Sequence, residues 1–176
     1  MNRLRRRLSL VLFVCVVLAF SISVYAISEP KVPAAHSVTA TLVIDFNQGQ
    51  PSMFAGHHVT WHYASGRWMM SSVPSSATVY VFENVTVPVS NVWTLMNYSS
   101  HIMLITAGSP LSIEKVYYPE YSDYFITSIE GVQNSNSLGL YWQYTVNGTL
   151  ALYGVLHQSI SDGSVVEWFY GTYSGQ

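Results

Sequence analysis

Cysteine and basic residues are almost missing from this 176-residue sequence after its first 26 positions. The single cysteine, Cys15, precedes that point, so the rest of the chain has no disulfide and no thiolate metal site. Three basic residues stand against nine acidic ones after residue 26, which leaves a net charge of −6. Nucleic-acid binding needs clustered basic residues, so the composition argues against DNA or RNA as a partner.

The first 26 residues have the composition of a secretory signal. Four of the seven basic residues lie in the first seven positions, and an apolar stretch begins at Leu8. Val24 and Ala26 fit the small-residue positions −3 and −1, which predicts cleavage after Ala26. The basic end stays in the cytoplasm, so the following chain is exported. We therefore expect a signal peptide over 1–26 and an extracytoplasmic protein.

An uncleaved membrane anchor is the open alternative for the same segment. Residues 8–27 amount to about 20 mostly apolar positions, enough to span a hydrocarbon core as a helix. Membrane contact would then run through these residues alone. The protein is expected to be secreted in the first case and held at the cell surface in the second.

Beyond the leader, the sequence predicts a short linker and one β-rich domain. Residues 27–36 contain two prolines and read as the linker, residues 37–171 as the domain, and residues 172–176 as a tail. The first strand is expected over 38–46, because apolar residues alternate along it. In this strand Val38, Ala40, Leu42 and Ile44 share one face.

Further strands and one helix follow from local patterns. The pair His57–Tyr63 and Arg67–Met70 predicts a hairpin around Ser65-Gly66. The only expected helix runs from Asn91 to Tyr98, with Ser90 as its cap. The remaining predicted strands are Thr78–Phe82, Val85–Val87, Met103–Thr106, Ser112–Tyr118, Tyr124–Ile129, Leu140–Val146 (ending at the hairpin signal Asn147-Gly148) and Val165–Tyr170.

A series of motifs in the C-terminal third carries a family resemblance. The motifs are Phe125-Ile126-Thr127-Ser128-Ile129-Glu130-Gly131, Tyr141-Trp142, Asn147-Gly148, Asp162-Gly163 and Val166-Glu167-Trp168. Their order and spacing resemble the transcobalamin-like C-terminal domain, a domain of unknown function in exported prokaryotic proteins. The same domain forms the small half of the vertebrate cobalamin carriers.

The resemblance implies a fold and a class of ligand. The implied fold is mainly β (α+β): a β-grasp-like sheet crossed by one short helix, with residues 47–80 as a hairpin insertion. The implied ligand is cobalamin-like. The sequence has no segment for the helical-barrel domain that accompanies this domain in the vertebrate carriers.

Aromatic residues are the strongest candidates for ligand binding. Five Trp and 13 Tyr exceed what a small core can bury, so some are expected to form exposed platforms for rings, sugars or a protein partner. We predict ligand contacts at Trp61 and Trp68 on the hairpin. Tyr141 and Trp142 are further candidates, because adjacent strand positions face opposite sides of the sheet.

Metal binding has one candidate cluster, formed by His57, His58 and His62. In a strand the last two share a face, and in a helix they would lie one turn apart, so two imidazoles could reach a zinc or copper ion. The alternative is a set of polar positions on a surface hairpin, since no acidic residue or cysteine nearby completes a site. No other cofactor is predicted.

The sequence has no evident catalytic motif, but it contains three possible N-glycosylation sequons. There is no Gly-x-Ser-x-Gly elbow and no phosphate-cradling glycine loop, and the carboxylates are scattered. Asn84, Asn97 and Asn147 begin possible N-glycosylation sequons, in agreement with export. We therefore expect a non-catalytic protein.

The sequence favours an exported binding or interaction module, secreted or at the cell surface. Its expected partner is a corrinoid-like small molecule, a surface protein or a polysaccharide. A structural subunit of a surface layer, adhesin or filament is the alternative, because an uncharged surface with free strand edges suits assembly. A hydrolase is the third hypothesis, and the oligomeric state stays open.

Overall fold

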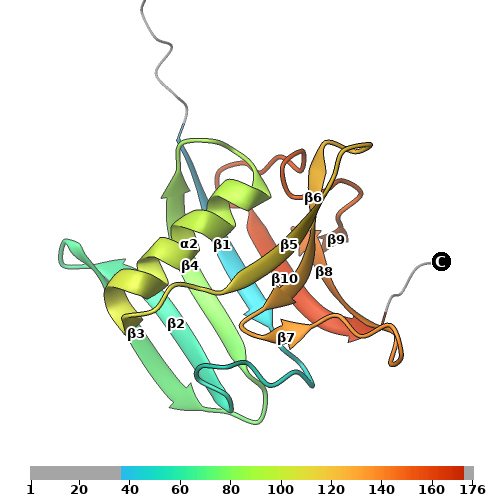
Figure 1. The fold of residues 1–176 in the computed structure, drawn as a ribbon. Helices are drawn as coiled ribbons and strands as arrows, with labels where there is room; N and C mark the ends of the chain where they lie inside the picture. Colours follow the sequence, from blue (N-terminus) through green and yellow to red (C-terminus); the bar gives the residue numbers. More distant parts are fainter. Residues whose placement is uncertain (1–36, 173–176) are drawn as a thin grey trace, which may run out of the picture. The chain divides into compact units, whose positions relative to one another are not determined.

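The computed structural model describes residues 37–172 (Figure 1), so the predicted leader, linker and last four residues lie outside the described part. The predicted cleavage after Ala26 is therefore not addressed by it. Within residues 37–172, no helix has the length and apolar character needed to cross a membrane.

The described residues form two β-sheets and one helix, which confirms the mainly β fold. The larger sheet has the order β3-β2-β4-β1-β10-β8-β9, and the smaller has the order β5-β6-β7. The elements are β1 (Val38–Asp45), β2 (His57–Ala64), β3 (Arg67–Pro74), β4 (Val79–Val87), α2 (Val92–Ala107), β5 (Ile113–Tyr118), β6 (Asp123–Ile129), β7 (Val132–Gln133), β8 (Leu140–Val146), β9 (Thr149–Leu150) and β10 (Val165–Thr172).

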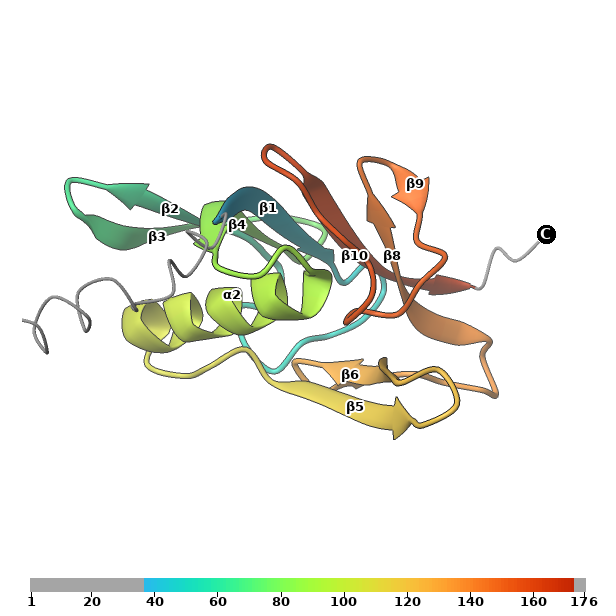
Figure 2. The ribbon, with the colours of Figure 1, turned by 90° about the horizontal axis from the view of Figure 1, so that it is seen from above.

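Strand β1, which the alternating pattern predicted, lies at the centre of the large sheet. It pairs antiparallel with β4 and parallel with β10. Val38, Ala40, Leu42 and Ile44 are all buried and join one continuous core. Figure 2 shows α2 and the small sheet on the same side of the large sheet, with α2 next to β1 to β4 and the small sheet below β8 and β10.

The helix is longer than predicted and begins at a different cap. Asn91, rather than Ser90, is the N-cap: its side-chain oxygen accepts the Thr94 N–H at 2.8 Å. The helix ends at Ala107, where Gly108 takes a left-handed conformation with φ of 79°. Both the predicted end at Tyr98 and the predicted Ser90 cap are wrong.

The strand expected over Met103–Thr106 is the last part of this helix. Its apolar residues continue the buried helical face of Leu95 and Ser99 through Ile102 and Met103. A four-residue apolar run is ambiguous between strand and helix, and packing against the sheet decides between them.

The β2–β3 hairpin is confirmed and extends the large sheet at one end. Strand β2 pairs parallel with β4 and antiparallel with β3, which leaves β3 as an edge strand. The two strands predicted over 78–87 form one strand, β4, because the chain continues pairing across Asn84 despite its φ of 53°. The predicted turn at Asn147-Gly148 is also confirmed, with positive φ at both residues.

Candidate functional site

An aromatic cavity of about 430 Å³ opens between β6 and the segment after β9. We call it the tyrosine cavity. It is lined by Tyr118, Tyr121, Asp123, Tyr124, Phe125, Leu152, Tyr153, Gly154 and His157. Six of these nine residues are aromatic or aliphatic, so the cavity presents an apolar wall with a small polar group at Asp123 and His157.

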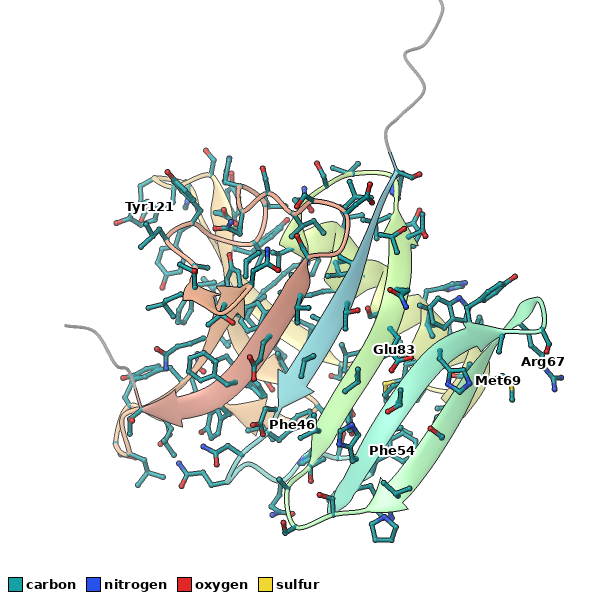
Figure 3. All side chains as sticks on the ribbon, turned by 180° about the vertical axis from the view of Figure 1, so that it is seen from behind. Phe46, Phe54, Arg67, Met69, Glu83 and Tyr121 are labelled. Carbon is teal, nitrogen blue, oxygen red and sulfur yellow. The ribbon has the colours of Figure 1, made fainter. Side chains whose placement is uncertain are left out.

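Several large apolar side chains at the rim are exposed to solvent. Tyr121 is 73 % exposed, Tyr153 is 65 % and Leu152 is 88 %. Figure 3 shows Tyr121 projecting outward. Grouped apolar side chains that a fold leaves in water commonly mark a place where something else binds.

The β5–β6 hairpin positions the aromatic wall. In its register Tyr118 lies opposite Asp123, and Val116 lies opposite Phe125. The Tyr118 and Phe125 rings meet edge to face at 90°, with centroids 6.3 Å apart. Their alternation along paired strands therefore places both rings on one face of the small sheet.

Asp123 joins β6 to the segment on the other side of the cavity. Its Oδ1 accepts the backbone N–H of Tyr124 at 2.7 Å and of Leu156 at 2.9 Å, and its Oδ2 lies 2.7 Å from His157 Nδ1. Burial pushes the pKa of Asp123 up, but the Leu156, His157 and Tyr124 hydrogen bonds outweigh it and lower the pKa below its ordinary value. A Cβ at Gly154 would overlap the Asp123 carboxyl group, which explains the glycine.

A deeper cavity of about 400 Å³ shares Tyr124, Phe125 and residues 152–154 with the tyrosine cavity. Its floor includes Trp168, which stacks on Tyr144 with centroids 4.6 Å apart. The Trp168 Nε1 atom is buried and has no hydrogen-bond partner among the described residues. An unpaired buried donor of this kind costs stability.

Tyr144 supports the same wall. Its hydroxyl donates to the Tyr153 carbonyl oxygen at 2.6 Å and so fixes the rim segment to β8. Burial, and to a smaller extent the Asp123 charge, raises the pKa of Tyr144 above its ordinary value. The hydroxyl therefore remains a protonated donor at physiological pH.

Two of the predicted platform residues, Trp61 and Trp142, are core residues. Trp61 is 0 % exposed, stacks on Phe82 and donates its Nε1–H to Thr106 Oγ1 at 2.8 Å. Trp142 is 3 % exposed and donates to the Val132 carbonyl at 2.7 Å. The expectation of an exposed platform is wrong for Trp61, because its indole fills the core and its N–H group finds a partner there. Of the adjacent pair Tyr141 and Trp142, Trp142 is the core member, and it also lines the cavity of about 400 Å³.

The other two predicted residues occupy different surfaces. Trp68 is half-buried on β3, edge to face with Tyr63 of β2, and does not line the tyrosine cavity. Tyr141 is half-buried and lines a third, more polar cavity that shares Tyr118 and Phe125. The tyrosines at the rim of the tyrosine cavity are not among the predicted residues, although five aromatic residues lie within positions 117–125 of the sequence.

The three clustered histidines do not converge. His58 and His62 share a face of β2, but four residues of strand separate them by about 13 Å. His57 lies on the other face, with Nδ1 3.1 Å from the Ala55 carbonyl oxygen. Within residues 37–172, no group of three His, Cys, Asp or Glu side chains is placed to hold a metal ion.

Asn84, Asn97 and Asn147, which begin the three sequons, are all exposed. Asn147 also uses its side-chain oxygen to accept the Val165 N–H at 2.9 Å.

Comparison with known proteins places the cavities in a recognised segment. Residues 112–172 match the family model described as "Domain of unknown function (DUF4430)". This segment contains every residue that lines the three cavities, and it includes the C-terminal motifs of the resemblance. The Val38–Phe46 and Val85–Leu95 stretches, which also resemble the transcobalamin-like domain, lie outside it. No curated protein matches the sequence.

Two solved structures resemble the fold distantly. Haptocorrin in complex with Cbi is 13 % identical with a TM-score of 0.45, and the match covers 79 % of this chain and 26 % of that one. A proposed metal-binding protein from Ruminococcus gnavus ATCC 29149 is 12 % identical with a TM-score of 0.40. That match covers 77 % of this chain and 97 % of the other. This chain thus spans about a quarter of the haptocorrin chain.

Proposed function

We propose that this chain is an exported, non-catalytic binding module whose tyrosine cavity takes a ring-bearing small molecule, of corrinoid-like character by the family resemblance. The observation that carries the proposal is the exposed apolar rim of Tyr121, Leu152 and Tyr153 beside the pair formed by the buried Asp123 and the exposed His157. A volume of about 430 Å³ lies within the range of small-molecule sites.

The chemistry of the walls favours a flat, largely apolar group. Edges and faces of Tyr118, Tyr124 and Phe125 offer ring contacts, and burial of their exposed carbon surface supplies the driving force. A ligand that reaches the deeper cavity meets the stacked rings of Tyr144 and Trp168. Both cavities therefore favour a ring system.

The polar groups of the cavity support binding rather than catalysis. Both oxygens of Asp123 are hydrogen-bonded within the protein, which gives this carboxylate a structural role. No serine, threonine or cysteine lines the tyrosine cavity beside the Asp123–His157 pair. A screen with generic ester, peptide and glycoside substrates tests the hydrolase hypothesis, and turnover abolished by His157→Ala would establish it instead.

Titration tests the proposal. Cyanocobalamin, its lower-ligand-free analogue cobinamide and a flat apolar dye are added to the purified protein, and binding is followed by calorimetry. We expect saturable binding of at least one, weakened at least tenfold by Tyr121→Ala. Tyr63→Ala is the matched control, because Tyr63 is also exposed, at 60 %, but lies on β2. Equal losses in both variants would contradict the proposal.

A structural subunit is the second candidate, and edge strand β3 favours it. Eight residues of this strand pair on one side only, with Arg67 as their single charge. Met69, Met70 and Val73 are exposed along it, and Figure 3 shows Arg67 and Met69 at this edge. Unprotected edges of this kind invite pairing with another chain.

Light scattering over a concentration series separates the two candidates. If the protein is a monomer at all concentrations, the structural-subunit candidate is excluded and the binding module stands. Concentration-dependent growth that Val73→Lys abolishes would support assembly through β3, because a charge on the strand opposes edge pairing. Expression of the full chain followed by cell fractionation tests export itself, and protein confined to the cytoplasm would overturn it.

A further inference from the structure

A polar cavity lies beside the tyrosine cavity and shares Tyr118 and Phe125 with it. We propose that it takes a neutral, hydroxyl-rich group, such as a sugar ring, attached to the apolar ligand of the tyrosine cavity. This inference rests on the proposed function, since both cavities would hold one molecule. It assigns the ligand to the class of glycosides of apolar rings.

The walls of the polar cavity mix hydrogen-bonding side chains with aromatic rings. Its volume is about 360 Å³. The hydrogen-bonding side chains come from β5, β6, the β7 region and β8, and they are Glu114, Thr127, Gln133, Asn136 and Tyr141. Carboxylate, amide and hydroxyl groups together offer both donors and acceptors, which is the complement of a ring of hydroxyl groups.

Some of these polar groups are fixed and others are free for a ligand. The Asn134 side chain donates to the Ile126 carbonyl at 3.0 Å and accepts the Trp142 N–H at 2.8 Å, which makes a rigid back wall. Tyr141 donates to Asn136 Oδ1 at 3.1 Å, so the amide nitrogen of Asn136 keeps its donors. The Glu114, Thr127 and Gln133 side chains line the cavity without a hydrogen bond to another described residue.

The charge of the cavity opposes an anionic ligand. Glu114 is its one acidic residue, and no basic side chain lines it to attract a phosphate or carboxylate. Lys115, the next residue along β5, lies on the other face of the small sheet, with Nζ 3.5 Å from the Trp93 ring centroid and 4.4 Å from that of Tyr124. An anion would therefore meet only the Glu114 carboxylate, and Coulomb repulsion would oppose its binding.

The shared aromatic residues connect the two subsites. Tyr118 and Phe125 line both cavities, and their rings are perpendicular. Aromatic faces can contact the C–H surface of a sugar ring while polar neighbours bind its hydroxyl groups. A glycoside can therefore place its apolar part beside Tyr121 and its sugar beside Gln133 without a break in contact.

The test compares matched probes on the purified protein by calorimetry. The probes are 4-nitroanisole, which carries only the apolar ring, and a panel of neutral 4-nitrophenyl hexosides, pentosides and N-acetylhexosaminides. We expect at least one glycoside to bind about tenfold more tightly than 4-nitroanisole. An amide analogue, 4-nitroacetanilide, is included; if it binds as tightly as the best glycoside, the sugar assignment is overturned.

Variants show which side chains supply the additional affinity of the glycoside. Glu114→Gln and Gln133→Ala should each remove most of the tenfold advantage of the glycoside and leave 4-nitroanisole affinity unchanged. Tyr121→Ala should weaken both probes. Glu120→Gln is the control for Glu114→Gln, because Glu120 is an exposed acid of the β5–β6 turn that lines neither cavity.

The outcomes separate this inference from the proposed function. If 4-nitroanisole or a corrinoid binds and Tyr121→Ala weakens it, but no glycoside gains affinity, the sugar subsite is wrong and the binding module stands. A gain that survives both Glu114→Gln and Gln133→Ala also overturns the subsite. Failure of every probe, the corrinoids included, counts against the proposed function as well.

Discussion

Single residues decide how the rim of the tyrosine cavity is held. Asp123 accepts hydrogen bonds from two backbone N–H groups and His157, and so links β6 to a segment more than 30 positions later. Trp61 and Trp142 show the limit of sequence reasoning at this scale. Composition correctly indicated that some aromatic rings are exposed, but which ones depends on the faces that α2 and the small sheet cover.

Asp123→Asn should destabilise the fold by about 1–3 kcal/mol, because the amide lacks the negative charge that strengthens the hydrogen bonds from the Tyr124 and Leu156 N–H groups and from His157. Urea denaturation measures the loss, with Glu120→Gln as the control for an exposed acid. Unchanged stability in Asp123→Asn would mean that the 152–157 segment is held by other contacts.

Acid should remove the difference in folding stability between the wild type and Asp123→Asn. The pKa of Asp123 is lowered in the folded state, so its ionised form stabilises the fold at pH values above the unfolded value of about 3.9. That contribution is lost as the pH falls through the lower, folded-state pKa. Denaturation curves from pH 7 to pH 2 test this, and a constant difference over that range would contradict it.

At the scale of elements, α2 shows what a local pattern can and cannot predict. The sequence placed a helix at the right point, since polar residues precede an apolar run. It failed at both ends, because Ser90 and Asn91 are equally good caps in sequence and because Met103–Thr106 suits a strand. Packing of Ile102 and Met103 against the sheet, a non-local fact, extends the helix.

Asn91→Ala should cost about 1 kcal/mol of stability, because the Thr94 N–H loses its partner. Ser90→Ala is the matched control and should change little, since Ser90 contributes its backbone carbonyl to Ile160 rather than a capping side chain. Thermal or urea denaturation of the two variants measures the effect. A larger loss of stability in Ser90→Ala than in Asn91→Ala would mean that Ser90 is the helix cap, as the sequence suggested.

At the scale of the molecule, the core and the cavities come mainly from different parts of the chain. Strands β1 to β4 and α2 contribute most of the largest buried side chains, whereas all three cavities are built from residues 112–172. The sequence predicted the mainly β fold and most strands, because alternation and turn residues are local signals. It could not predict the cavities, because they form between segments far apart in sequence. Two of them lie where β6 meets residues 150–157, and the polar cavity lies where β5 and β6 meet residues 133–141.

The central claim is that ligand binds at the tyrosine cavity and not at the β2–β3 hairpin. The five tryptophan indole N–H resonances of the isotope-labelled protein, followed by NMR during a titration with the tightest ligand found by calorimetry, test it most directly. The account predicts a shift of the Trp168 resonance, because the deeper cavity that Trp168 lines shares Tyr124, Phe125 and residues 152–154 with the tyrosine cavity. The Trp61 and Trp68 resonances should not shift. Shifts of Trp61 and Trp68 with Trp168 unchanged would place the site on the hairpin and contradict the account.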